Sequence, residues 1–383
     1  MGMKLRGVTA LLVVIVLAVV AAGCGGGDGQ SSDAETKLKP DDQAYIDYQN
    51  ISTDEKLHTG LPCTGSSDSQ VAPNPEEAAA YEAPTADKEY TIGFMEPTLA
   101  GHYYQAGSSG AFKAADDAGV KLEFVSAGTG YASPEQQLDQ ADQLVQKGVD
   151  AAVIIPTDIQ GGVAVTNRFI DEGIPVVIVG TEAGSPDAYM VMQDDYQMGL
   201  DSADLVAEEL GENAGPGIVI AGPANATWSA KRAAGFADRV EEAYPGIEIV
   251  ASPTQNVDPA LGLKSFENAV QANPDINWVY TVFNLLLDPD SLSSQYQDVA
   301  FVTNGLDPAT IEDLNQGQVS KVIGITPTPM GYQGVGTAVS ILNGDQDVPA
   351  LVCIPLTVYE KADMPPDETA QTLELIQPGY APS

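Results

Sequence analysis

Cysteine, histidine and basic residues are scarce in this chain of 383 residues. It contains 3 cysteines, 2 histidines and 16 lysines and arginines against 54 aspartates and glutamates, and its formal net charge is −38. Phosphate groups repel so acidic a protein, which argues against nucleic acid and anionic membrane surfaces as partners. The few histidines, and the absence of HExxH, GxSxG, phosphate-loop and Cys/His-cluster patterns, argue against an enzyme; we expect no metal site and no cofactor.

Long apolar runs are also absent, except near the N-terminus. Lys4 and Arg6 precede a short apolar run at residues 11–20, and small residues then lead to Cys24. This order is typical of an export signal, and we expect residues 1–23 to be removed. Small residues directly before a cysteine resemble a bacterial lipobox, so we predict that Cys24 is acylated and anchors the chain to the outer face of the cytoplasmic membrane. A plain secretory signal with a chance cysteine is the alternative.

Residues 24–89 differ in composition from the rest of the chain. After Cys24 they begin with GGGDGQSS and are rich in Pro, Asp, Glu and Ser, which is typical of a flexible tether. Part of this segment is expected to pack on the domain, because residues 44–65 contain several large apolar side chains: Tyr45, Ile46, Tyr48, Ile51 and Leu61.

The two remaining cysteines are Cys63, in the tether, and Cys353, near the C-terminus. Exported proteins mature in oxidising compartments, where spare cysteines often pair. We therefore predict a disulfide that joins the tether to the domain; two separate buried thiols are the alternative.

From residue 90 onward, short apolar runs alternate with segments of helical period. We expect strands at residues 91–95, 121–126, 151–155, 175–179, 217–221, 247–251, 278–283, 300–304 and 321–325. We expect helices at residues 103–118, 133–147, 161–172, 198–210, 229–243, 260–272 and 331–342. The strand candidates are nearly continuous apolar runs, as in parallel sheets that helices cover on both faces. Two successive series of this kind predict an α/β protein with two doubly wound parallel-sheet lobes.

Several stretches carry a family resemblance through their order and spacing. They include TIGFMEPTLAGHYYQAGSSGAFKAADDAGV (91–120), GVDAAVIIPTD (148–158), NPDINWVYTVFN (273–284) and NQGQVSKVIGITPTPMGYQG (315–334). In this order they resemble type I periplasmic binding proteins of the ribose- and galactose-binding group. The resemblance implies three crossings between the lobes, near residues 193–194, 325–326 and 354–355. Lobe one would then comprise residues 90–193 plus 326–354, and lobe two residues 194–325 plus 355–383, joined by a three-stranded hinge.

The resemblance also implies a function. Such a chain would be the exported, lipid-anchored solute-binding protein of an ABC importer, located on the extracellular or periplasmic side of the membrane. As a monomer it would close its lobes around a small polar ligand (a sugar, a polyol or a nucleoside) and deliver that ligand to an ABC permease. The alternative is a ligand-sensing lipoprotein that docks on a membrane receptor or a sensor kinase.

A sugar offers hydroxyl groups and apolar C–H faces, so its site needs fork-shaped polar side chains and aromatic rings. The resemblance places the first ligand loop directly after the first strand. Five side chains there are candidates: Glu96, Thr98, His102, Tyr103 and Tyr104. The alternatives are that the tyrosine pair packs beneath the loop and that Glu96 is solvated.

Further candidates follow later strands. Thr181, with Glu182, stands where sugar-binding relatives often carry an Asp-Arg pair. Asp194, or its neighbour Asp195, lies at the first crossing, where hinge hydrogen bonding is the favoured role. Arg232 matches a structural arginine of the family. In lobe two the candidates are Trp228, Asn284, Asn304 and Asp307, with Thr326 at the second crossing.

Several charged ligand contacts of the family have no counterpart in this chain. Ala230 stands near the position of its ligand-binding arginine, Gly305 at that of a common aspartate and Ile325 at that of a common glutamine. The ligand is therefore expected to differ from the standard sugars of the group, because a fold does not determine its ligand.

Overall fold

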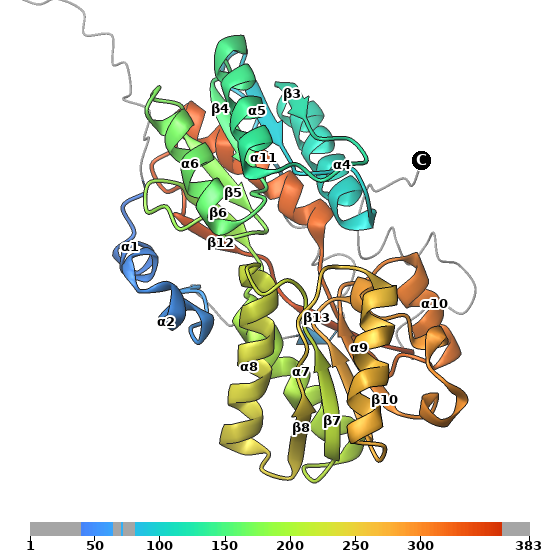
Figure 1. Cartoon of the computed structure of the whole chain (residues 1–383). Coiled ribbons are helices and arrows are strands. Elements are labelled where there is room, and N and C mark those ends of the chain that lie inside the picture. The colour runs from blue at the N-terminus through green and yellow to red at the C-terminus, as the bar shows by residue number, and fades with distance from the viewer. Residues whose placement is uncertain (1–39, 64–69, 72–80, 362–383) are drawn as a thin grey trace, which may run out of the picture. The chain divides into compact units, whose positions relative to one another are not determined.

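The computed structural model describes residues 40–63, 70–71 and 81–361 (Figure 1). The predicted signal peptide, the predicted lipidation site Cys24 and residues 362–383 lie outside the described residues. The described chain is an α/β protein with two sheets, which confirms the predicted fold class. No helix in these residues is long and apolar enough to cross a bilayer.

The first sheet has six strands in the order β12-β6-β5-β4-β2-β3, and every neighbouring pair is parallel. Helices α4 (His102–Ala118) and α11 (Pro327–Asn343) pack together on one face, and α5 (Pro134–Lys147) and α6 (Ile159–Ile170) pack together on the other. We call this unit lobe one. Its strands are β2 (Thr91–Met95), β3 (Lys121–Val125), β4 (Ala151–Ile154), β5 (Val176–Val179), β6 (Tyr189–Met192) and β12 (Leu351–Cys353).

The second sheet has seven strands in the order β1-β13-β11-β10-β9-β7-β8. All neighbouring pairs are parallel except β11 and β13. We call this sheet and its helices lobe two. The strands are β1 (Gln70–Val71), β7 (Gly215–Ile220), β8 (Ile247–Ala251), β9 (Trp278–Thr281), β10 (Ala300–Asn304), β11 (Lys321–Gly324) and β13 (Thr357–Glu360).

Four helices belong to lobe two. Helices α7 (Asp195–Leu210) and α8 (Thr227–Ala243) pack together, and α9 (Pro259–Ala272) packs against β7. Helix α10 (Pro308–Gln316) follows β10. Three short 3₁₀ turns, η1 (Asn284–Leu286), η2 (Pro289–Ser291) and η3 (Ser294–Tyr296), connect β9 to β10.

The chain passes between the two sheets three times. It leaves the first sheet after β6, returns to it after β11 through α11, and leaves it again between β12 and β13. Among the strands and helices of the two lobes, the sequence pattern did not reveal β1, β6, β12, β13 or α10. Helices α7 and α11 also begin three or four residues earlier than predicted, because an N-cap aspartate starts α7 and a proline in its first turn starts α11.

Helix α5 shows how local sequence sets an element. The side chain of Ser133 accepts a hydrogen bond from the Gln136 amide (3.2 Å), and the Gln136 side chain accepts one from the Ser133 amide (2.9 Å). This capping box satisfies amides that the first turn leaves without partners. The helix ends at Gly148, whose φ of 73° is costly for other residues. Both ends agree with the predicted helix.

Two pairs of helices approach each other through glycine. A Cβ at Gly331 of α11 would collide with the carbonyl oxygen of Gly107 in α4, and one at Gly235 of α8 would collide with that of Tyr196 in α7. Glycine at these positions therefore permits the two backbones to pack directly on each other. The contact at Gly331 holds α11 on lobe one, where the chain arrives from β11 of lobe two.

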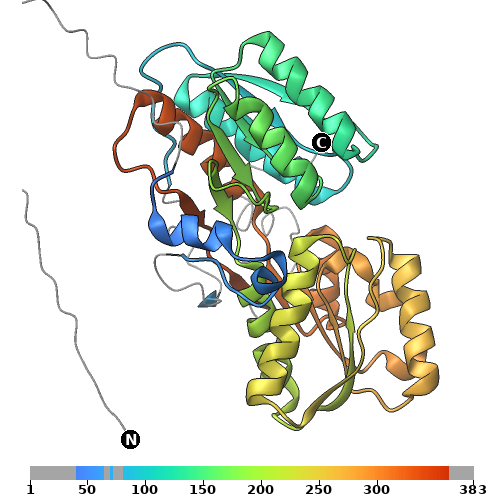
Figure 2. The ribbon, with the colours of Figure 1, turned by 60° about the vertical axis from the view of Figure 1, so that its left-hand side comes forward.

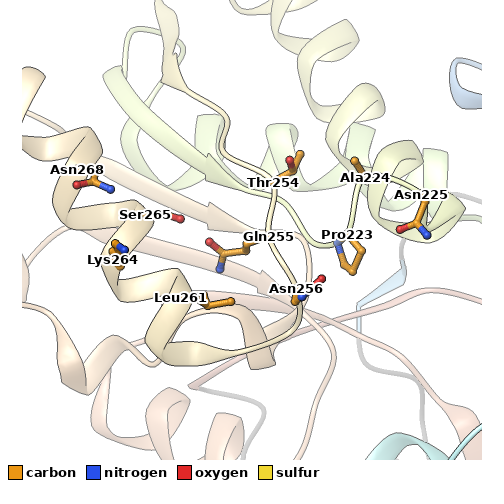
Figure 3. Close-up of a pocket in the computed structure, with 10 residues that line it drawn as sticks. All are labelled: Pro223, Ala224, Asn225, Thr254, Gln255, Asn256, Leu261, Lys264, Ser265 and Asn268. Carbon is orange, nitrogen blue, oxygen red and sulfur yellow. The ribbon is translucent and has the colours of Figure 1, made fainter. Parts of the chain in front are cut away.

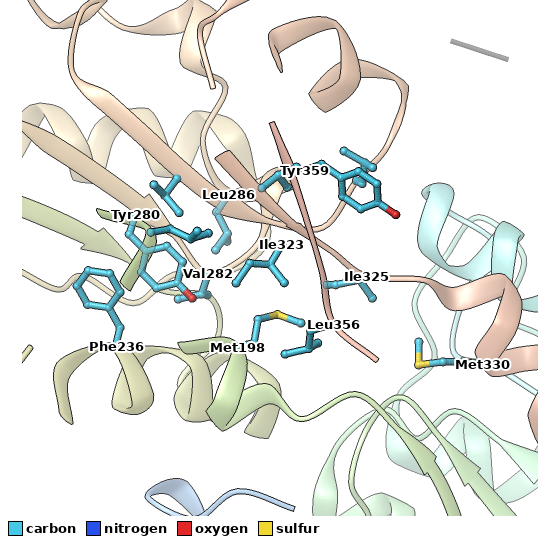
Figure 4. Packing of buried hydrophobic residues seen from close by; sticks show 14 of the residues in the cluster. Met198, Phe236, Tyr280, Val282, Leu286, Ile323, Ile325, Met330, Leu356 and Tyr359 are labelled. Atoms are coloured by element: carbon cyan, nitrogen blue, oxygen red, sulfur yellow. The ribbon is translucent and has the colours of Figure 1, made fainter. Parts of the chain in front are cut away.

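The interior of lobe two contains large aromatic side chains (Figure 4). The ring of Phe236 on α8 stacks on that of Tyr280 on β9, with 4.7 Å between centroids, and lies 5.3 Å from that of Trp278. All three side chains are fully buried. Burial of a side chain of this size stabilises the fold by about 1.5–3 kcal/mol.

The N-terminal segment adds two helices, α1 (Gln43–Asn50) and α2 (Thr53–Leu57), shown in blue in Figure 2. The side chains of Tyr45, Tyr48 and Leu61 are buried, as expected for a segment that packs on the domain. The predicted disulfide between Cys63 and Cys353 is present, with 6.0 Å between the Cα atoms. It joins the N-terminal segment to β12, at the third crossing between the sheets.

Reduction of this disulfide should lower the free energy of unfolding by about 2–5 kcal/mol, because the bond joins residues 290 positions apart and restricts the unfolded chain. Urea unfolding with and without reductant measures the difference. The double variant Cys63→Ser/Cys353→Ser is the control, since reductant has no bond to break in it. A wild-type midpoint that does not respond to reductant would contradict this role.

Candidate functional site

Most of the candidate residues follow strands at their carboxyl ends. In lobe one, residues 96–101 follow β2 and residues 180–188 follow β5; in lobe two, residues 221–226 follow β7 and residues 305–307 follow β10. Ligands of open parallel α/β sheets bind beyond this edge. The residues that these loops bring together therefore form the candidate ligand site.

Lobe one contributes a cluster of tyrosines. The rings of Tyr103 and Tyr104 are 5.1 Å apart in an edge-to-face arrangement, and Tyr131 lies 6.3 Å from Tyr104. The hydroxyl groups of Tyr104 and Tyr131 are 3.4 Å apart. A Cβ at Gly180, which has a φ of 71°, would collide with the hydroxyl group of Tyr103. Glycine after β5 therefore makes room for this ring.

Lobe two contributes a second aromatic cluster. Trp228, in the first turn of α8, packs edge-to-face on Phe283, with 5.6 Å between the ring centroids. The guanidinium group of Arg232 lies 5.2 Å from the Trp228 ring. A cation over an aromatic face stabilises the arrangement by about 0.5–2 kcal/mol and holds the indole in one orientation.

Arg232 itself donates its hydrogen bonds to protein groups. Its guanidinium group donates to Asp195 Oδ1 at 2.9 and 2.6 Å and to the Val282 carbonyl at 2.8 Å. Gln193 donates to the same carboxylate and to the Gly180 carbonyl. This buried network joins the first crossing to α8, so Arg232 acts here as a structural residue, which is the favoured role from the sequence.

Groups of the two lobes lie within electrostatic range of each other. Burial raises the pKa of Tyr103, and the charges of Asp195 and Arg232 also act on its hydroxyl group. Burial lowers the pKa of His102, and the negative charge of Asp307 opposes that shift. The first loop of lobe one and the loops of lobe two thus face a common region.

Eight of the predicted ligand residues are half-buried, so each has surface available to a ligand. Seven of them lie in the loops or first helical turns that follow the strands, and Thr326 lies at the second crossing. They are His102, Tyr103, Tyr104, Thr181, Trp228, Asn284, Asp307 and Thr326.

The other four predicted ligand residues are buried and have almost no surface to offer: Glu96, Thr98, Asp194 and Asn304. Asn304 hydrogen-bonds Tyr280 and Ser202, and Thr98 hydrogen-bonds the loop backbone. Asp194 caps α7 and accepts from the Leu61 amide at 2.8 Å. In this structure these three side chains support the loops and the hinge, and ligand contact by any of the four would require a loop to move.

Glu96 differs from the other three, because neither of its carboxyl oxygens has a hydrogen-bond partner. Burial raises the pKa of Glu96 to about 9. The alternative of a solvated carboxylate is therefore wrong: the side chain is fully buried and is a neutral acid at pH 7.

Asn284 and Asp307 are linked through one threonine. The Asn284 amide donates to the Thr310 hydroxyl group (2.9 Å), and Asp307 accepts from both the hydroxyl group and the amide of Thr310. A Cβ at Gly305 would lie 2.6 Å from the Asn284 amide oxygen. Glycine at position 305 therefore leaves room for this side chain, which is half-buried.

Three residues of the site were not predicted from the sequence: Tyr131, Phe283 and Gln193. Phe283 directly precedes Asn284, and an aromatic residue at the end of a strand was an available signal. Tyr131 reaches Tyr104 from the loop before α5, and only the tertiary fold reveals this contact.

A polar pocket of about 500 Å³ lies between α9 and the loops after β7 and β8, and part of the loop 221–226 lines it (Figure 3). Its lining includes Asn225, Gln255, Lys264 and Asn268, and it contains none of the predicted ligand residues. No cluster of three or more metal-ligating side chains occurs in residues 40–63, 70–71 and 81–361.

Residues 92–346 match the periplasmic binding protein domain, which covers more than half of the chain. The chain therefore belongs to the periplasmic binding protein family, as the resemblance implied. The relatives are binding proteins, which agrees with the prediction that the chain is not an enzyme.

Individual relatives agree with this assignment. The chain is 25% identical over 261 residues to the ribose import binding protein RbsB of Bacillus subtilis, covering 67% of this chain and 83% of RbsB. It is 25% identical over 302 residues to the ABC transporter periplasmic-binding protein YphF of Escherichia coli, covering 74% and 90%. A carbohydrate transporter solute-binding protein from Agrobacterium radiobacter, solved with D-arabinose, superposes with a TM-score of 0.65 at 24% identity, covering 76% and 99%. That structural likeness supports the fold.

The raised pKa of Glu96 predicts a pH dependence of stability. The folded protein keeps this proton up to about pH 9, whereas the unfolded chain releases it near pH 4.5. Below pH 4.5 this group therefore does not change the free energy of unfolding with pH. As the pH rises from 4.5 toward 9, the free energy of unfolding falls by about 1.4 kcal/mol per pH unit.

Urea unfolding of the wild type and of Glu96→Gln at pH 6, 7 and 8 measures this effect. The glutamine variant is isosteric and does not titrate, so the wild type should lose stability relative to it with rising pH. A constant difference between the two proteins over this range would show that Glu96 does not hold a proton.

Proposed function

We propose that this chain is the extracytoplasmic solute-binding component of an ABC importer, and that it binds a sugar or polyol between its two lobes. The observation that carries the proposal is the pair of aromatic clusters, Tyr103–Tyr104–Tyr131 and Trp228–Phe283, at the carboxyl ends of the strands of both lobes. Rings on both sides suit the two C–H faces of a pyranose, a furanose or a cyclic polyol. The relatives that import ribose support the same ligand class.

The charged groups near the site favour an uncharged ligand. Arg232 is neutralised by Asp195, and Glu182 by Lys231 at 2.7 Å. Asp307 is the one carboxylate among the half-buried candidates, and it caps α10 through Thr310. Most of the remaining half-buried candidates are neutral donors and acceptors: Tyr103, Tyr104, Thr181, Asn284 and Thr326. Such groups match hydroxyl groups, whereas an ionic ligand would require a counter-charge.

Binding would proceed by rotation of the lobes about the three crossings, with lobe one at residues 90–193 plus 326–354 and lobe two at residues 194–325 plus 355–383. Few residues need to change conformation in such a hinge, since each lobe has its own sheet. The chain would act as a monomer and present its liganded form to the permease. An acylated Cys24 would keep it at the outer face of the cytoplasmic membrane, within reach of that partner.

A thermal-shift screen with pentoses, hexoses, polyols and nucleosides should identify a ligand. A compound present at 100 times its dissociation constant stabilises the native state by about 2.7 kcal/mol, which is readily detected. No shift with any of these compounds, together with a shift from amino acids or peptides, would overturn the proposal.

Trp228→Ala should abolish most of the shift produced by the active compound, because it removes one of the two rings of the lobe-two cluster. Phe112→Ala is the control. Phe112 is 47% exposed and packs on Phe124, so its loss should lower the melting temperature without changing the increment that the ligand adds. Equal loss of the increment in both variants would count against a role for Trp228.

A further inference from the structure

The N-terminal segment contacts both lobes, and its first helix is attached to lobe one. The hydroxyl group of Tyr45 donates to the backbone carbonyls of Ala188 (2.7 Å) and Ser185 (3.3 Å), in the loop before β6. The side chain of Gln49 contacts the sulfur of Met190 in β6 itself. All of these atoms are buried, so α1 is part of the packed interior of lobe one.

The second helix is attached to lobe two. Helix α2 packs on α8, and Nδ1 of His58, the residue after α2, lies 2.7 Å from the carboxylate of Asp238 on α8. Lys56 connects the two short helices: its amino group donates to the backbone and the side chain of Gln49. The two helices therefore form one unit with a contact to each lobe.

The residues after α2 are attached to the crossings between the lobes. The Leu61 amide donates to the carboxylate of Asp194, where the chain first leaves lobe one. Cys63 is bonded to Cys353, where the chain last leaves it. Residues 43–63, which we call the hinge strap, thus touch lobe one, lobe two and two of the three crossings.

A buried cluster of three side chains lies at the centre of these contacts. Lys231 of α8 in lobe two donates to Glu182 of lobe one (2.7 Å) and to the hydroxyl group of Tyr48 in the strap (2.5 Å). That hydroxyl group donates in turn to both oxygens of Glu182 at 3.0 Å. The side chain of Lys231 is 0% exposed and that of Glu182 is 5% exposed.

We propose that the hinge strap limits how far the two lobes open. Its key residue is Tyr48, whose hydroxyl group hydrogen-bonds both members of the ion pair between Lys231 and Glu182. Separation of the lobes at this point moves Lys231 away from Glu182. A buried charge that loses its partner is strongly destabilised unless water reaches it. The hydroxyl group of Tyr48 contacts both charged groups, and α1, which carries Tyr48, is held on lobe one.

The matched substitutions Tyr48→Phe and Tyr45→Phe test this inference. Both remove one hydroxyl group from α1 and leave a buried ring. Tyr48 bridges the two lobes through its hydroxyl group, whereas Tyr45 bonds only to lobe one. The readout is the interlobe distance distribution of the ligand-free protein, from electron–electron resonance between spin labels at Asp139 on α5 and Glu267 on α9. Both positions are exposed, and labels on ketone-bearing side chains leave the disulfide intact.

Tyr48→Phe should shift the distribution to longer distances, with at least about a tenfold rise in the ratio of open to original populations, because the hydroxyl group's hydrogen bonds to Lys231 and Glu182 are lost. Tyr45→Phe should leave the distribution unchanged. A triple variant, Tyr48→Phe/Cys63→Ser/Cys353→Ser, releases both attachments of the strap and should open further. Because no ligand is needed, the result does not depend on the proposed function.

Two results would overturn the inference. One is an unchanged distribution in both Tyr48→Phe and the triple variant, with far-UV circular dichroism confirming that both are folded. The other is an equal shift in Tyr45→Phe, which would show that the opening reflects general loosening of α1 and not the loss of the bridge.

Discussion

Two neighbouring cations of α8, Lys231 and Arg232, are buried where the lobes meet, in a chain with only 16 basic residues. Each has a buried carboxylate partner, Glu182 in lobe one and Asp195 on α7. A buried ion pair contributes little net stability, but removal of either partner costs about 3–5 kcal/mol. The two pairs therefore specify an arrangement: α8 fits against the first crossing and lobe one only where both carboxylates are within reach.

This arrangement also accounts for the neutral character of the ligand site. Arg232 lies beside Trp228, yet its donors are directed to Asp195 and to a backbone carbonyl. The two buried ion pairs thus hold the scaffold together, and most of the groups that remain for the ligand are rings, hydroxyl groups and amides.

The parallel strands of both lobes could be predicted from the sequence, because a strand covered on both faces is a continuous apolar run bounded by turns. Strand β6 (Tyr189–Met192) escaped prediction because it follows β5 with no helix between them, outside the alternation of strands and helices on which the predictions rested. Helix α10 escaped because its sequence is largely polar, and its N-cap, Asp307, was interpreted only as a ligand residue.

Within the site, adjacent rings such as Tyr103 and Tyr104 could be predicted together from one loop. The partnership of Tyr104 with Tyr131 joins residues from different loops, and no local pattern encodes it. The burial of Glu96 could likewise not be predicted from the sequence, since a carboxylate next to a strand is usually solvated.

The disulfide between Cys63 and Cys353 has a consequence for where the finished molecule can exist. In a reducing cytoplasm both residues stay as thiols, and residues 43–63 are held by non-covalent contacts alone. The covalent attachment forms only in an oxidising compartment. Completion of the hinge thus depends on the compartment: a chain that is still in the cytoplasm cannot form the covalent link between its N-terminal segment and the third crossing.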